Sequence, residues 1–82
     1  MEMRKIMIRE LETVVLRRDI PEHGLAKGDV GAVVHRYADD EGYEVEFVTA
    51  EGRTVAMLTL TESEIRPMAR REILHARELA SA

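Results

Sequence analysis

Strict alternation of apolar and acidic residues over residues 43–47 (Tyr-Glu-Val-Glu-Phe) is the feature that most constrains the fold of this chain. Successive side chains of a β-strand point to opposite faces, so a period of two indicates a strand with one buried face and one wet face. We therefore expect Tyr43, Val45 and Phe47 to face the core, and Glu44 and Glu46 to face water.

Four further short segments have the composition of strands and are separated by turn residues. They are residues 13–16 (TVVL), 28–35 (GDVGAVVH), 54–60 (TVAMLTL) and 65–67 (IRP). Their β-branched residues and glycines disfavour a helix, and Gly31 inside the second segment is typical of a bulge or bend. A long first loop, tight later turns and one helical turn at residues 61–64 complete the order of an SH3-like barrel. We therefore predict a mainly β fold, a small five-stranded SH3-like barrel over residues 11–67.

The composition changes after Pro67, and residues 69–80 are rich in Ala, Arg, Glu and Leu without glycine or proline. A helix there would have one apolar face, formed by Ala69, Ile73, Ala76 and Ala80, with Leu79 beside them. A helix of about twelve residues is marginal alone in water, so it must dock on the barrel, pair with a second copy or fray. We expect its apolar face to be buried, either on the barrel or in a homodimer. The predicted organisation is an N-terminal extension (1–10), the barrel (11–67) and a C-terminal α-helix (68–82). The sequence of the extension fits an edge strand, a helix or a disordered segment.

The length of 82 residues allows one domain with little stability to spare. Cysteine is absent, and His23, His35 and His75 share no ligand spacing, so we predict no disulfide, no metal and no cofactor. Small domains often need stabilisation beyond their hydrophobic core, and oligomerisation is the source of it that this sequence still allows. No apolar run reaches the roughly 18–20 residues of a membrane span, and the first residues lack a signal-peptide pattern. We therefore expect a cytoplasmic protein without membrane association.

Charge is distributed unevenly along the chain. Residues 21–67 contain four basic and ten acidic residues, a net charge of −6, whereas residues 68–82 carry +1. A body of that sign repels a phosphate backbone. The residues we predict to bind a basic protein form an acidic face, and the alternative is an ordinary solvent-exposed surface. They are Glu44, Glu46, Glu62 and Glu64.

The order of motifs resembles a bacterial domain-of-unknown-function family of short proteins. The motifs are LxTVVL at residues 11–16, DxPExGL at 19–25, GDxGxVV at 28–34, YxVEF at 43–47 and IRP at 65–67. The resemblance implies an SH3-like fold but supplies no activity, and it suggests small gene pairs of the toxin–antitoxin or immunity type. More distantly, residues 28–34 are similar to the second strand of ribosome-associated KOW motifs and of nitrile hydratase β-subunit barrels.

Three patterns could be mistaken for chemical sites. Glu22 and His23 could form a general-base pair, but we interpret them as solvated loop residues. Gly24, Gly28 and Gly31 lie in a stretch that opens a strand, without the Gly-Lys-Ser/Thr and helix that a phosphate-binding loop requires. The acidic turn at residues 39–41 lacks the alternating oxygen ligands of a calcium loop. We therefore predict no catalytic site and expect that the protein is not an enzyme.

Few aromatic residues are present, which argues against a proline-peptide groove, because Tyr43 and Phe47 belong to the predicted core. We expect a non-catalytic protein-interaction module, an antitoxin- or immunity-like partner of another small protein. The alternative is a KOW-like nucleic-acid- or ribosome-associated binding domain. Arg70, Arg71 and Arg77 on the predicted helix favour this alternative, and the acidic body opposes it.

Overall fold

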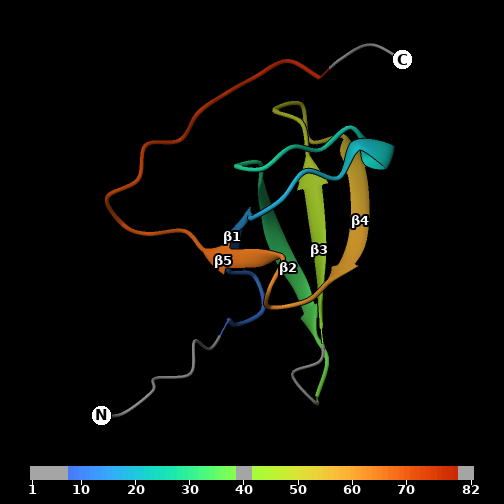
Figure 1. Ribbon diagram of the computed structural model, residues 1–82, viewed down its shortest axis with the longest axis vertical. Coiled ribbons are helices and arrows are strands. Elements are labelled where there is room, and N and C mark those ends of the chain that lie inside the picture. The colour runs from blue at the N-terminus through green and yellow to red at the C-terminus, as the bar shows by residue number, and fades with distance from the viewer. Residues whose placement is uncertain (1–7, 39–41, 80–82) are drawn as a thin grey trace.

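The computed structural model describes residues 8–38 and 42–79 and is mainly β. Within these residues, five strands follow one another, with one 3₁₀ turn, η1, in the first loop (Figure 1). The elements are β1 (Thr13–Leu16), η1 (Pro21–His23), β2 (Val30–Arg36), β3 (Tyr43–Val48), β4 (Thr54–Leu60) and β5 (Ile65–Pro67). The prediction of five short strands is confirmed, and no α-helix occurs among the described residues.

All five strands form one antiparallel sheet in the order β4-β3-β2-β1-β5. The sheet is strongly curved, and β5 runs across the direction of β2, β3 and β4 in Figure 1. β4 and β5 are its two edges, and no ladder joins them within the described part of the chain. The sheet is therefore not closed into a barrel, and the prediction of a barrel is confirmed only at the level of a five-stranded antiparallel sheet.

The alternation of residues 43–47 sets the two faces of the sheet as expected. Tyr43, Val45 and Phe47 are at most 2% exposed, whereas Glu44 and Glu46 are half-buried on the opposite face. The register shifts at two places, between Val33 and His35 in the β2–β3 ladder and between Phe47 and Val48 in the β3–β4 ladder. Such irregularities bend and twist a sheet locally.

Gly31 has a different role from the bulge that the sequence suggested. It pairs regularly with Val14 in the β1–β2 ladder. A Cβ atom at Gly31 would lie 2.7 Å from Val45 Cγ1 and 2.8 Å from Phe47 Cε1. Glycine is thus required at this position by the close approach of β3, and the register shift lies further along β2.

The core lies inside the curved sheet and includes residues from outside the strands. Ile20 and Leu25, from the first loop, pair in an isolated bridge and are both buried. Ile8, the first described residue, is only 1% exposed. The buried cluster consists of Ile8, Val14, Leu16, Ile20, Leu25, Val33, Tyr43, Val45, Phe47, Ala56, Leu60 and Ile65.

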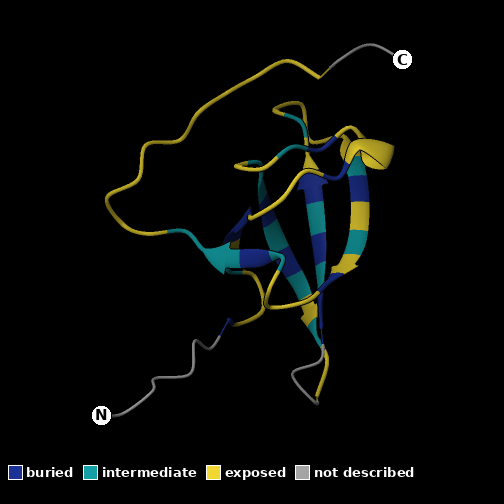
Figure 2. Ribbon diagram, in the orientation of Figure 1, coloured by how far each residue is buried: buried dark blue, intermediate teal, exposed yellow. Residues whose placement is uncertain are grey.

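The predicted C-terminal helix is wrong. Residues 68–79 form an irregular, extended segment, which we call the strap, and it runs outside the sheet from β5 toward the first loop (Figure 1). Residues 69–79 of the strap are exposed (Figure 2), including Ala69, Ile73 (92% exposed), Ala76 and Leu79. Ala80, the last residue of the predicted apolar face, lies outside the described residues, as do residues 1–7 of the N-terminal extension.

The reason for the missing helix is physical. A helix of this length is held mainly by burial of its apolar face, and residues 69–79 bury no such face, since all of them are exposed. Instead, Glu72 accepts hydrogen bonds from Arg66 Nη1 at 2.7 Å and from the Ala69 backbone N–H at 2.6 Å. These donors, the Arg66 guanidinium first, lower the pKa of Glu72 to about 2. None of the described residues belongs to a helix that could span a membrane.

Candidate functional site

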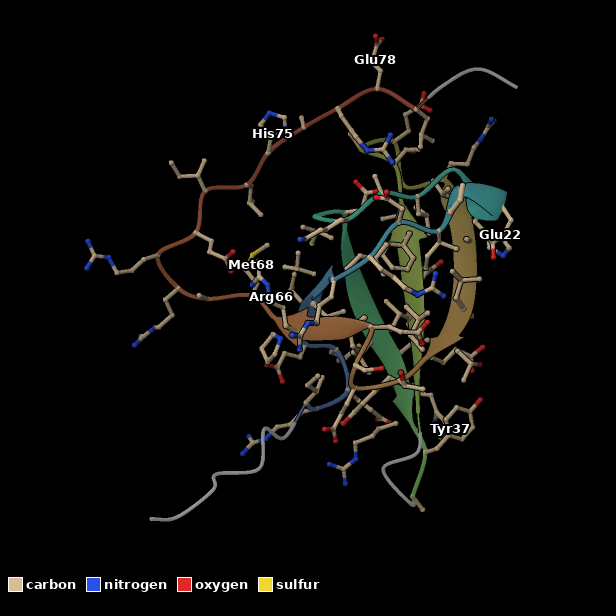
Figure 3. The ribbon with its side chains drawn as sticks, viewed as in Figure 1. Glu22, Tyr37, Arg66, Met68, His75 and Glu78 are labelled. Atoms are coloured by element: carbon tan, nitrogen blue, oxygen red, sulfur yellow. The ribbon has the colours of Figure 1, made fainter. Side chains whose placement is uncertain are left out.

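A groove of about 640 Å³ separates the strap from the sheet, and we call it the strap groove. Its sheet side is formed by the first loop, the start of β2, and the end of β3 with its turn into β4. These residues are Leu25, Asp29, Val30, Phe47, Val48, Thr49, Ala50, Glu51 and Val55. Residues 75–79 of the strap form the opposite side. Figure 3 shows Glu78 of the strap pointing away from the sheet.

Asp29 holds the strap to the sheet through Arg77. Arg77 Nε donates a hydrogen bond to Asp29 Oδ1 at 2.8 Å, and Arg77 Nη2 donates to Asp29 Oδ2. The same Nη2 donates to the Gly24 carbonyl oxygen at 2.9 Å. Two parallel N–H···O bonds to one carboxylate are the geometry in which arginine binds most specifically. The arrangement therefore recognises a guanidinium and not simply a positive charge.

The electrostatics of this pair favour the ionised forms. Hydrogen bonds from Arg77 hold the pKa of Asp29 below its ordinary value of 3.8, against the opposing effect of partial burial. The Ala26 backbone N–H, which donates to Asp29 Oδ2 at 2.8 Å, acts in the same direction. The Asp29 carboxylate in turn raises the pKa of Arg77. Asp29 is therefore a carboxylate at neutral pH.

Glu44 and Glu46 lie on the outer face of β3, opposite Thr59 and Met57 of β4. Tyr37 Oη donates to Glu44 Oε1 at 3.3 Å, and Thr54 Oγ1 donates to Glu46 Oε2 at 2.6 Å. Met57, 48% exposed, brings an apolar side chain next to Glu46. The structure thus places the first two predicted binding residues together on one face, which we call the outer face of β2, β3 and β4.

His35 belongs to the same surface and was not singled out from the sequence. It pairs with Glu44 across the β2–β3 ladder, and its ring packs edge-on against Tyr37 with 4.7 Å between ring centroids. Glu10 Oε2 lies 3.5 Å from His35 Nδ1. The two-residue spacing of His35 in β2 and Tyr37 just after it is a sequence signal that both side chains lie on one face. Glu10 is brought there because the neighbouring residues, Leu11 and Glu12, hydrogen-bond through their backbones to Val33 of β2.

Glu62 and Glu64, the other two predicted binding residues, lie in the turn between β4 and β5. Glu62 is exposed, but Glu64 accepts hydrogen bonds from Arg18 Nε at 2.9 Å and Nη2 at 2.7 Å. Glu64 also accepts the Thr61 backbone N–H at 2.8 Å, and this bond, with the help of Arg18, lowers the pKa of Glu64. Glu64 is therefore occupied by a basic side chain of the same molecule and is not part of a free acidic face.

The remaining predicted positions are dispersed. Glu22 and His23 are exposed on η1, and Glu22 points into solvent (Figure 3). Arg70 and Arg71 are exposed on the strap, whereas Arg77 is engaged by Asp29. Over residues 8–38 and 42–79, no three His, Asp or Glu side chains gather as a metal would require. The turn at residues 39–41 lies outside the described residues.

Comparison with known families adds one match. The model of a family described as a domain of unknown function (DUF4926) matches residues 10–67. The chain belongs to this family. Its matched range contains all five strands and the sheet side of the strap groove, but not the strap. Neither the curated proteins nor the solved structures contain a match for the chain.

Proposed function

We propose that this DUF4926 protein is a non-catalytic protein-interaction module that binds a basic partner protein through the outer face of β2, β3 and β4. The observation that carries the proposal is the pair of half-buried carboxylates, Glu44 and Glu46, next to the half-exposed Met57. We interpret the strand order β4-β3-β2-β1-β5 as that of an SH3-like barrel left open between its edge strands.

Both carboxylates are held by hydroxyl groups of neighbouring residues, Tyr37 and Thr54. A side chain that is already ordered loses less conformational entropy when a partner binds it. Acidic groups on a surface steer a basic partner and raise its association rate more than its final affinity. Met57 adds apolar area of the kind found at the centre of an interface. The surface therefore combines electrostatic steering with a contact that can exclude water.

The partner class that we propose is a small basic protein that this chain neutralises, in the manner of an antitoxin or immunity protein. The net charge of −6 on residues 21–67 and the resemblance to small paired gene products support it. The absence of a catalytic role is part of the same proposal. Glu22 and His23, the one acid–base pair suggested by the sequence, are both exposed on η1 and do not line the strap groove.

The test begins with capture of partners from an extract of the native cell, followed by co-expression and purification of the basic protein recovered. Association rates are then measured for wild type, Glu44→Lys, Glu46→Lys and the matched control Glu22→Lys, which changes charge equally on exposed η1. We expect the two outer-face variants to associate roughly tenfold more slowly at low salt, with the control near wild type. Equal rates for all four proteins would refute the outer-face mechanism.

A further inference from the structure

We propose that the strap groove is a second binding site, for an extended segment of another protein that carries arginine followed two residues later by an apolar residue. Residues 75–79 of the strap line the opposite side of the groove and place Arg77 on Asp29, so they compete for this site within the molecule. This site is distinct from the outer face on which the proposed function rests, because it is built from the first loop and the end of the β3–β4 hairpin.

The charge of the groove fits such a segment. Its sheet side contains two acidic residues, Asp29 and Glu51, and no basic residue. The rest of that side is largely apolar, formed by Leu25, Val30, Phe47, Val48 and Val55 together with Thr49 and Ala50. An arginine with a nearby apolar side chain complements both components. The strap supplies this combination itself, with Arg77 on Asp29 and Leu79 lining the groove.

The arginine position is formed by the sheet side without help from the strap. Asp29 is oriented by the Ala26 N–H, and its side chain is only 18% exposed in the presence of Arg77. The Gly24 carbonyl follows η1, where Gly24 adopts φ 69° and donates its own N–H to the Pro21 carbonyl. Together these groups offer three oxygen acceptors to one guanidinium. Lysine has no planar fork of donors and cannot reproduce these bonds.

The strap is attached loosely enough to be replaced. Between its contact with Arg66 through Glu72 and its contact with Asp29 through Arg77, the strap exposes Ile73 (92%) and Leu74 (70%). Leu79 is itself 41% exposed at the groove. No core residue lies in the strap, so residues 73–79 can leave without disturbing the sheet. A segment from another chain with the same chemistry can then bind in their place.

The experiment uses the full chain and a labelled peptide, Glu-Ile-Leu-His-Ala-Arg-Glu-Leu, which has the sequence of residues 72–79. Arg77→Ala removes the intramolecular competitor but leaves Asp29 intact. Fluorescence anisotropy should show saturable binding of one peptide per Arg77→Ala chain, at least tenfold tighter than binding to wild type. The matched control is Arg70→Ala, which removes an exposed arginine of the same strap and should behave like wild type.

Two further changes identify the contact. Adding Asp29→Asn to the Arg77→Ala chain should weaken peptide binding at least tenfold, and far-UV circular dichroism checks that this variant folds. A peptide with lysine in place of arginine tests the same contact without altering the protein and should also bind at least tenfold more weakly. Adding Glu44→Lys to the Arg77→Ala chain should leave peptide binding unchanged, so the groove and the outer face can fail independently.

Three results would overturn the proposal. The first is absence of peptide binding to the Arg77→Ala chain. The second is equal binding of the arginine and lysine peptides, because the site would then recognise charge alone. The third is a wild-type dimer, measured by light scattering, that becomes a monomer in Arg77→Ala. That result would place the strap of a second copy in the groove and not an intramolecular competitor.

Discussion

Replacing Gly31 by alanine should destabilise the protein by crowding the core between β2 and β3. Gly31 is buried, and the added Cβ would lie 2.7 Å from Val45 Cγ1, 2.8 Å from Phe47 Cε1 and 3.0 Å from the Glu46 carbonyl oxygen. Carbon atoms in optimal contact lie about 3.5–4.0 Å apart, so these neighbours must move. One of them is backbone, which cannot rotate away as a flexible side chain can.

The expected magnitude follows from two opposing effects. Overpacking of a close-packed core costs about 1–3 kcal/mol. Alanine also restricts the unfolded chain, which recovers about 0.4–1 kcal/mol. The net loss for Gly31→Ala should therefore be about 1–2 kcal/mol. In a domain of this size each 1 kcal/mol lowers the melting temperature by roughly 4–8 °C, so a decrease of about 5–15 °C is expected.

Urea unfolding followed by circular dichroism measures this change, and a double-mutant cycle identifies its cause. Val45→Ala removes the atom nearest to the added Cβ, so the double variant should be about 1 kcal/mol more stable than the sum of the single effects predicts. Gly28→Ala is the control, because Gly28 has φ 97° and open space around its Cβ position. It should lose stability through backbone strain, without coupling to Val45. A Gly31→Ala chain as stable as wild type would refute the steric argument.

Three other predictions concern the turn, the strap and the alternative partner. The pKa of Glu64 is lowered in the folded protein, so its contribution to the free energy of unfolding is complete above the ordinary pKa of 4.5 and is lost as the pH falls below that value. Glu64→Gln should therefore flatten the acid side of the plot of stability against pH. An unchanged plot would contradict this role. Carbon-13 chemical shifts of residues 69–79 should lack a helical pattern, and a continuous helical run would contradict the strap. Labelled DNA and RNA should show no micromolar binding at low salt; affinity that falls steeply with salt would instead favour the KOW-like alternative.

The strands could be predicted because their signals are local. Alternation over residues 43–47 and the β-branched runs around it depend only on which side chains can face water, and the structure has strands at all five positions. The helical turn expected at residues 61–64 is a hydrogen-bonded turn, in which the Glu64 backbone N–H donates to the Thr61 carbonyl and the Glu64 carboxylate accepts the Thr61 N–H. The role of Gly31 could not be read in the same way, because the space around it is set by Val45 and Phe47 of another strand.

The candidate sites were harder to predict for the same reason. Glu44 and Glu46 share a face because they are two residues apart on one strand. Whether a carboxylate is free depends on partners far along the chain, and Glu64 is paired with Arg18, 46 residues away. His35 and Glu10 meet because residues 11–12 are hydrogen-bonded to Val33 of β2. Neither contact can be predicted from the residues that surround Glu64 or His35 in the sequence.

The amino-acid sequence by itself determined the strand positions, the buried face of β3 and the acidic character of the body, because periodicity and composition act over a few residues. Whether residues 69–79 form a helix or an extended strap was decided only by the tertiary structure. Their apolar stripe is a local pattern, but a short helix is stable only if a surface covers that stripe. The first loop instead presents Asp29 and the Gly24 carbonyl, 48 and 53 residues before Arg77, and these contacts hold an extended strap in place of a helix.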